Sequence, residues 1–280
     1  MYPISSTQFN PYKAVGPAQE TSSEIAWLSE IYHENSKLRV HDQGLYVWIS
    51  WVNTSAEIRH IISRPCTDYL GYPRIALPHA DPPVPGSFGA AAVNRRSTRL
   101  FSGKQMDIAT FGRMLYLGDG VVHTAEADDG SKWLLRTAPS GGGLYPIELY
   151  CVVRNVAALD PGLYFYSAAE HHLLQLTAGD LTSRLIEAMP SVRASIETSC
   201  ASIVLVGVLP RIRFKYGERA YRFVLLEGGH IAQNLLLAAQ DMGLGALPIG
   251  GFIDDDLNRL LRLDGLEEVS LYVVTVGLVA

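Results

Sequence analysis

The sequence predicts an α+β fold, because helix-type and strand-type patterns are intermixed along the chain around one long apolar helix. Of the 280 residues, 48% are hydrophobic and 18% are charged, a balance typical of a globular protein with a substantial core. The run 202–209 is continuously apolar, which fits a buried central strand. The run 221–242 is almost wholly apolar and ends before Gly243. We therefore expect a helix that is buried inside the domain or in a subunit interface.

The N-terminal third is expected to be an extension of the main domain. A Thr-Ser-Ser-Glu capping box at 21–24 predicts the start of a helix, and 46–52 is a candidate strand or buried edge. Six prolines fall between positions 65 and 86, too many for a helix or a central strand. We place the boundary in this proline-rich linker, with an extension at 1–88 and the main domain at 89–280. The apolar side of the first helix would carry Ile25, Leu28, Ile31 and Tyr32.

After the linker, helices and strands alternate. The helix predicted at 107–117 has Phe111, Met114 and Leu115 at helical spacing and Gly118 at its end. The strands predicted at 162–166 and 173–176 are close enough in the sequence to form a hairpin. Three successive aspartates begin the helix predicted at 254–263. Acidic side chains in the first turn stabilise a helix through its dipole. Helices are predicted at 107–117, 181–189 and 254–263, and strands at 147–153, 162–166, 173–176 and 270–279.

Charge and composition exclude several classes of function. A net charge of −5 argues against a nucleic-acid-binding surface, which needs a basic excess. The three cysteines show no paired spacing, so we expect no disulfide framework and a reducing compartment. No apolar run approaches the ~18 residues of a membrane span, and the N-terminus lacks a signal-peptide pattern. A cytoplasmic protein that does not bind membranes is expected.

A local basic segment stands out against this acidic background. Arg95, Arg96 and Arg99 surround Ser97 within five residues. Guanidinium groups are planar, fork-shaped donors that suit a phosphate dianion. A solvated face with surface salt bridges is the alternative interpretation of such a run.

A glycine-rich segment follows about forty residues later, at 138–146, and reads Ala-Pro-Ser-Gly-Gly-Gly-Leu-Tyr-Pro. Three successive glycines let the backbone approach a flat ligand where a Cβ would clash. An ordinary surface loop is the alternative. No Gly-x-Gly-x-x-Gly or Gly-Lys-Ser/Thr loop is present, so neither a Rossmann site nor a P-loop is predicted. No metal-ligand spacing is found either.

Together these segments resemble the flavin nitroreductase superfamily, in the branch that oxidises azoline rings to thiazoles and oxazoles. Two further matches are 247–252 (Leu-Pro-Ile-Gly-Gly-Phe) and 214–223, and the resemblance covers roughly 90–280; before it, only 32–37 matches, loosely. It implies a nitroreductase fold with a mixed sheet flanked by helices, an intertwined homodimer and bound FMN. The residues that it implies for binding FMN are Arg95, Arg96, Ser97, Arg99, Pro139, Ser140, Gly141, Gly142, Gly143, Gly250 and Gly251.

The pair Lys215-Tyr216 matches the Lys-Tyr pair of azoline dehydrogenases and is the candidate catalytic pair. Removing a Cα proton near neutral pH requires a base with a pKa near 7, which neither residue has in water. Burial would lower the lysine pKa, and a neighbouring ammonium would lower the tyrosine pKa. Both can meet one substrate only if the chain loops there, which Gly217 would permit. A solvated lysine beside a packed tyrosine is the alternative, and the sequence does not say which residue is the base.

The expected function is FMN-dependent oxidation of a thiazoline or oxazoline, with dioxygen as electron acceptor. The substrate would be a ribosomal peptide or a carrier-tethered intermediate, with a cyclodehydratase as a candidate partner. One alternative is an NAD(P)H-dependent nitro- or quinone reductase, since a fold does not determine its chemistry. Another is a catalytically silent docking subunit of a peptide-modifying complex.

Overall fold

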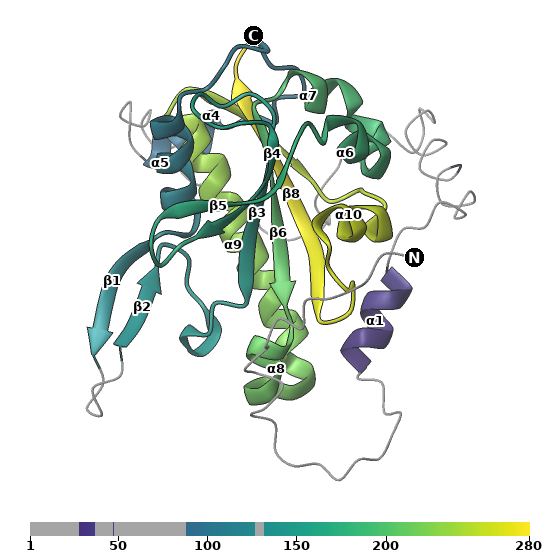
Figure 1. Ribbon diagram of the computed structural model, residues 1–280. Coiled ribbons are helices and arrows are strands. Elements are labelled where there is room, and N and C mark those ends of the chain that lie inside the picture. Colours follow the sequence, from purple (N-terminus) through teal and green to yellow (C-terminus); the bar gives the residue numbers. More distant parts are fainter. Residues whose placement is uncertain (1–27, 37–46, 48–87, 127–131) are drawn as a thin grey trace, which may run out of the picture.

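The computed structural model describes residues 28–36, 47, 88–126 and 132–280 (Figure 1). Its centre is a six-stranded sheet in the order β5-β4-β3-β6-β8-β7, in which every neighbouring pair is antiparallel. The strands are β3 (Ile147–Val153), β4 (Gly162–Ser167), β5 (His172–Ala178), β6 (Ala201–Val208), β7 (Leu244–Ile249) and β8 (Glu268–Leu278).

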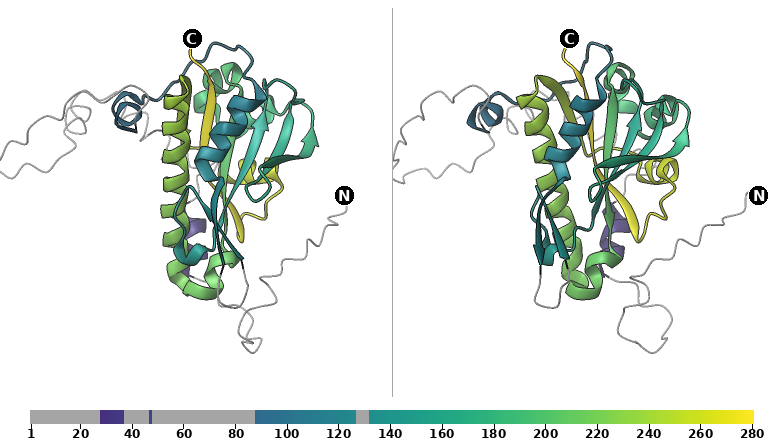
Figure 2. Two further views of the ribbon diagram at one scale, coloured as in Figure 1. Left: turned by 90° about the vertical axis from the view of Figure 1, so that its left-hand side faces the viewer. Right: turned by 60° about the vertical axis from the view of Figure 1, so that its left-hand side comes forward.

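Helices cover both faces of the sheet (Figure 2). On one face lie α5 (Ile108–Asp119) and α9 (Ala220–Asp241). On the other lie α6 (Thr182–Ala188) and α10 (Asp254–Leu261), with α7 (Arg193–Thr198) at its end. Successive strand residues face opposite sides, so Leu205 joins the α5/α9 core, whereas Val204 and Val206 join the α6/α10 core. The α+β prediction is confirmed.

The helix α9 packs closely on the central strand β6, all eight residues of which are buried. A Cβ on Gly207 of β6 would lie 2.7 Å from Val224 Cγ1 of α9 and 2.9 Å from Leu271 Cδ1. Such distances are far inside van der Waals contact, so the glycine permits the close approach of helix and sheet. This packing sets the position of every α9 side chain relative to the sheet.

Only one face of α9 is buried in the domain. Leu225 is 43% exposed and Leu226 is 59% exposed. Inside the domain, the expected burial is therefore met by one face only, because a single helix packed on a sheet buries about half of its circumference. Burial of the exposed face in a subunit interface stays a prediction.

Several elements were not predicted. A hairpin of β1 (Val121–Glu126) and β2 (Lys132–Arg136) forms a separate two-stranded sheet. The strand β7 was missed because only its end was recognised, as part of a glycine motif. The others are the helices α4 (Phe88–Asn94), α7 and α8 (Pro210–Tyr216) and the 3-10 turns Gly141–Gly143, Pro190–Val192 and Gly217–Arg219.

The elements that were predicted with strong patterns match closely. The strand at 147–153 coincides with β3, and the hairpin of β4 with β5 is present. The helix predicted at 107–117 is α5. Asp107 is its N-cap rather than its first residue, with Oδ1 accepting from the Thr110 N–H at 2.8 Å, and the helix continues two residues beyond the predicted end.

In the N-terminal extension the structure describes α1 (Leu28–Ser36) and Val47. The predicted apolar side is not the buried one: Leu28, Ile31 and Tyr32 are at least 46% exposed, whereas His33 is buried. The predicted strand at 46–52 gains no support from Val47, which is helical and exposed. The capping box, the linker and the domain boundary fall outside the described residues or stay untested.

No helix in the described ranges combines the length and hydropathy needed to cross a bilayer.

The fold predicts a cost for adding a side chain at Gly245 in β7. Its Cβ would lie 2.7 Å from Thr98 Cγ2 and 2.9 Å from Thr98 Cβ, and the Thr98 backbone is hydrogen-bonded to Ala246. We expect Gly245→Ala to destabilise the fold by about 1–3 kcal/mol, the usual cost of overpacking, measured by urea unfolding.

The matched control is Gly112→Ala in α5, where the nearest atom to the new Cβ is 3.7 Å away. This variant should be neutral or slightly stabilising, because alanine favours a helix. Equal stability of the two variants would contradict the close packing of Thr98 on β7.

Candidate functional site

The basic segment runs beside the edge strand of the sheet. Ser97 forms a parallel bridge with Ala246 of β7, and the Thr98 N–H donates to the Ala246 carbonyl at 2.9 Å. The Arg99 carbonyl accepts from Ser195 Oγ at 2.7 Å. These backbone contacts hold the segment in place and leave the arginine side chains directed outward.

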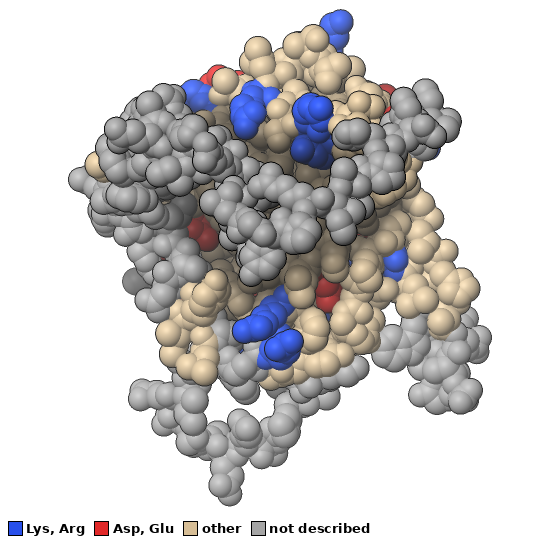
Figure 3. Space-filling model, turned by 180° about the vertical axis from the view of Figure 1, so that it is seen from behind, with Lys and Arg blue, Asp and Glu red and all other residues tan. Residues whose placement is uncertain are grey.

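The three guanidinium groups are not used in salt bridges with the rest of the described chain. Arg96 and Arg99 are exposed and Arg95 is half-buried. Arg96 Nη1 donates to the carbonyls of Val93 and Arg95 at 2.8 and 2.9 Å. Ion pairs with carboxylates of described residues are absent for all three. Basic side chains form separate groups on the face seen in Figure 3. The salt-bridge alternative therefore gains no support.

The glycine-rich segment is a tight loop between β2 and β3. Gly142 has φ 68° and Gly143 has φ 66°, in the left-handed region that glycine adopts without strain. Tyr145 has φ 46°, which is unfavourable for a residue with a Cβ. Glycine is thus required at 142 and 143 by the backbone conformation. This requirement alone does not distinguish a ligand-binding loop from an ordinary surface loop.

Four contacts hold Tyr145 in this conformation. Its N–H donates to Ser140 Oγ at 2.8 Å, and its carbonyl accepts from Arg211 Nη1 at 2.9 Å. Its hydroxyl accepts from the Arg136 N–H at 3.0 Å, and the Arg136 guanidinium carbon lies 4.7 Å from the ring centroid. A strained backbone persists when its surroundings determine it in several ways.

A buried carboxyl group lies beneath this loop. Asp119 is 1% exposed, and its Oδ2 accepts from Arg136 Nη1 at 2.6 Å. Burial raises the pKa of Asp119 to about 6, although the Arg136 guanidinium acts in the opposite direction. Its Oδ1 is buried without a hydrogen-bond partner in the described part of the chain.

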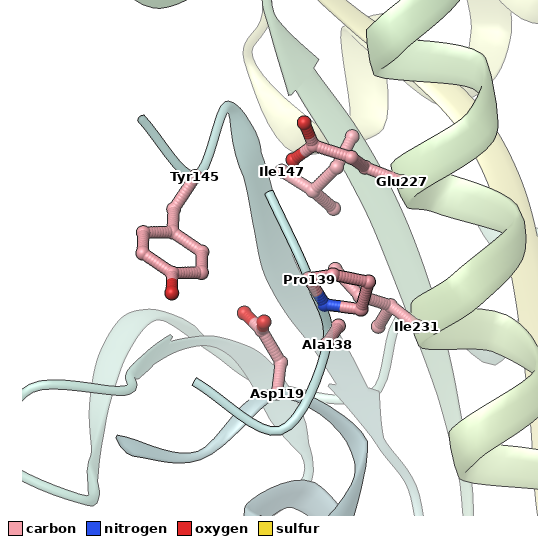
Figure 4. Close-up of a pocket in the computed structure, with 7 residues that line it drawn as sticks. All are labelled: Asp119, Ala138, Pro139, Tyr145, Ile147, Glu227 and Ile231. Carbon is pink, nitrogen blue, oxygen red and sulfur yellow. The ribbon is translucent and has the colours of Figure 1, made fainter. Parts of the chain in front are cut away.

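Glu227 of α9 is the second buried carboxyl group beside the loop. It is 4% exposed, and its Oε1 accepts from the Gly141 N–H at 2.8 Å. Burial raises its pKa, while hydrogen bonds from the Gly141 N–H and the Ser140 side chain lower it. The small pocket in Figure 4 opens between the two acids. It is lined by Asp119, Ala138, Pro139, Tyr145, Ile147, Glu227 and Ile231.

The candidate catalytic pair lies at the end of α8, a helix where a loop was expected. Gly217 follows with φ 53° and turns the chain, as anticipated. Neighbouring residues of a helix point about 100° apart rather than to opposite sides. Lys215 and Tyr216 could therefore face one substrate more readily than on a strand. The side chain of Lys215 lies outside what the structure describes.

Tyr216 is connected to the glycine-rich loop through one aromatic ring. The ring centroids of Tyr216 and Phe223 are 4.8 Å apart. A Cβ on Gly141 would lie 3.5 Å from the Phe223 ring. The structure therefore brings together two predicted groups of site residues, the tyrosine and the glycine-rich loop.

The other predicted residues lie elsewhere on the sheet. Gly250 and Gly251 follow β7, and a Cβ on Gly251 would have no neighbour within 4 Å. Through β8 and β6, Ala246 is in register with Val153 of β3, at the opposite end of that strand from Ile147. Six residues of strand span roughly 20 Å. The arginine segment and the glycine-rich loop of one chain thus lie toward opposite ends of the strands of the sheet; the strands are drawn in Figure 1.

The helix α1 packs beside the candidate catalytic pair. Glu30 Oε1 accepts from Arg213 Nη1 of α8 at 2.6 Å. His33 Nδ1 lies 2.8 Å from Tyr221 Oη, in a buried contact with the start of α9. The loosely matching segment at 32–37 therefore begins at Tyr221, near the start of α9, which the sequence did not indicate.

Sequence reasoning missed Asp119, Arg136 and Glu227. Each lies at or near the end of an element or in an apolar helix, without a local pattern of its own. The unusual placement of an acid among apolar residues of α9 was the one available signal for Glu227.

The raised pKa of Asp119 predicts a pH-dependent stability. A carboxyl group with a raised folded-state pKa contributes stability that is present below its ordinary pKa of 3.8 and lost as the pH rises through about 6. A shift of about two units corresponds to roughly 3 kcal/mol. Between about pH 4 and pH 7, the free energy of unfolding of Asp119→Asn should therefore rise relative to that of the wild type by up to this amount, measured by urea unfolding. A difference that does not change with pH would rule out this role.

Comparison with known proteins agrees with the fold and the motifs. The nitroreductase family model matches residues 92–278. MJ1384 of Methanocaldococcus jannaschii, named as a nitroreductase, is 28% identical over 66% of this chain and 87% of its own. The microcin B17-processing protein McbC of Escherichia coli is 28% identical over 51% of this chain, which spans about half (54%) of McbC.

A solved structure extends the comparison. A chain of the E. coli microcin synthetase McbBCD complex with truncated pro-MccB17 bound superposes with a TM-score of 0.58 and 20% identity. The match covers 92% of this chain and 99% of the other, and it supports the nitroreductase fold. With a family model that covers about two thirds of its length, the chain belongs to the nitroreductase family.

Proposed function

We propose that this protein is an FMN-dependent dehydrogenase that converts azoline rings of a peptide natural product into azoles. The observation that carries the proposal is the contact of Tyr216, through Phe223, with the glycine-rich loop. A candidate base thus lies one aromatic ring away from the loop expected to receive a flavin. The similarity to a microcin B17-processing protein supports a role in peptide modification.

The residues present fit an FMN group. Guanidinium groups at 95, 96 and 99 have no carboxylate partner among the described residues and would hold the phosphate, with Ser97 beside them. Pro139, Ser140 and the glycines 141–143 would lie along the ring. The open space at Gly251 leaves room for a ring system near the end of β7.

A homodimer would complete this site. The arginine segment and the glycine-rich loop lie roughly 20 Å apart along the sheet, so one FMN would more readily contact the first from one chain and the second from another. The exposed Leu225 and Leu226 of α9 supply an apolar face for that association. A partner enzyme, such as a cyclodehydratase, would supply the azoline.

The chemistry assigned to this chain is proton abstraction. Lys215 or Tyr216 would take the Cα proton of the azoline, and the C–H electron pair would form the new ring double bond as hydride leaves the neighbouring carbon. Bound FMN would supply the acceptor for that hydride, and dioxygen would be the final electron acceptor. Aromatisation of the ring favours the product.

The second candidate is an NAD(P)H-dependent reductase. The match to MJ1384, which covers 87% of that protein, favours it. A reductase needs an open site above the ring and no base, so the role of Lys215-Tyr216 separates the two functions. A docking subunit without activity would carry no FMN.

Loss of a phosphate contact should weaken FMN binding. Removing a hydrogen bond to a charged group costs about 1.5–3 kcal/mol, or roughly tenfold or more in affinity. We expect Arg99→Ala to lose FMN on dialysis, measured by flavin absorbance per chain. Arg113→Ala is the control, because Arg113 is also an exposed arginine, on α5. Full occupancy of Arg99→Ala would show that the phosphate lies elsewhere.

Substitution of the candidate pair should abolish turnover without loss of flavin. Acid–base catalysis contributes about 10²–10⁴-fold, so Lys215→Ala and Tyr216→Phe should lose azoline oxidation on that scale while staying folded and yellow. Reduction by dithionite should be unchanged, since it bypasses removal of a proton from carbon.

The control for Tyr216→Phe is Tyr116→Phe on α5, which removes the hydroxyl of a partly exposed tyrosine that contacts His171. Oxidation of a thiazoline at near wild-type rate by both pair variants would move the reductase function ahead.

A further inference from the structure

Glu227 is a buried acid whose partners all belong to one loop. It lies on the buried side of α9 and is 4% exposed. Ion pairs between Glu227 and a Lys or Arg are absent from the described part of the chain. Its Oε1 instead accepts from the Gly141 N–H at 2.8 Å. A buried charge is costly unless it is hydrogen-bonded, so this contact stabilises both the acid and the loop.

The effect of this contact extends through Ser140, the neighbour of Gly141. The Ser140 Oγ accepts from the Tyr145 N–H at 2.8 Å. By holding Gly141, Glu227 restrains the start of the loop whose Ser140 in turn holds Tyr145. The left-handed backbone of Tyr145 is unfavourable for a residue with a Cβ, and the contacts of Ser140 help to offset this strain.

Figure 4 shows how the acid is placed. Glu227 projects from α9 toward the loop, on the opposite side from Asp119 and Tyr145. Arg136 holds Tyr145 from the β2 side, through its N–H and its guanidinium group. The loop is consequently held between a strand and a helix, and Glu227 is the contact from the helix.

We propose that Glu227 is a positioning residue that holds Gly141 so that the glycine-rich backbone is already shaped to receive the flavin ring. The inference rests on the proposed FMN binding and adds to it a residue that acts through the loop. Because α9 packs on β6 at Gly207, Glu227 also fixes the loop relative to the sheet. Pre-organisation of this kind strengthens binding by removing the cost of ordering the loop.

The test compares FMN affinity with thermal stability in Glu227→Leu, Glu227→Gln and Asn234→Leu. Affinity is measured on flavin-free full-length protein by quenching of FMN fluorescence, and stability by circular dichroism. Leucine leaves the Gly141 N–H unsatisfied, so we expect at least a tenfold loss of FMN affinity. Glutamine keeps one acceptor oxygen, so the loss should be smaller, about threefold.

Asn234→Leu is the matched control. Asn234 is a half-buried polar residue two turns further along α9, and its Nδ2 donates to the Gly118 carbonyl at 3.3 Å. This substitution should change stability and leave FMN affinity within about twofold, because the loop is untouched.

An FMN affinity of Glu227→Leu close to the wild-type value would overturn the proposal and show a merely structural acid. Should Glu227→Leu fail to fold, Glu227→Gln decides, and unchanged affinity in that variant would also overturn it. Wild-type protein that binds no FMN contradicts the proposed function as well, whereas equal affinities of wild type and variants contradict the positioning role alone.

Discussion

The close packing of α9 on β6 is the contact on which the rest of the structure depends. Gly207 lets the helix approach the central strand, and every functional feature of α9 follows from that position. Its start carries Tyr221, which contacts α1, and Phe223, which lies between Tyr216 and the glycine-rich loop. One helical turn later, Glu227 enters the buried space beneath that loop. Core packing and the candidate site are therefore built by the same helix.

The sheet separates the two candidate halves of a flavin site. Its edge strand β7 holds the arginine segment. The glycine-rich loop leads into the start of β3, at the opposite end of the strands. The exposed leucines of α9 lie on the side of that helix turned away from its own sheet. In the proposed homodimer, a second copy of the chain would join the two halves, and the exposed leucines of α9 would lie in the subunit interface.

Much of the fold could be predicted from local patterns. The continuous apolar run predicted as a strand at 202–209 corresponds to β6 within one residue at each end, and the strand predicted at 147–153 is β3. The hairpin of β1 and β2 was missed because its exposed strands lack such a period. The end of α8 was read as a loop because seven residues after a proline carry little helical pattern. His33 was missed because its burial depends on Tyr221, 188 residues away. The segments of the candidate site could be found from glycine and arginine runs, but not the acids that position them, since Glu227 and Asp119 meet the loop only in three dimensions.

The central claim is that this chain takes electrons from an azoline rather than from a nicotinamide. Anaerobic mixing of the yellow protein with a synthetic thiazoline peptide, and separately with NADPH, tests it directly through the flavin absorbance. We expect rapid bleaching by the peptide and little or none by NADPH. Bleaching by NADPH alone would contradict it and identify a reductase.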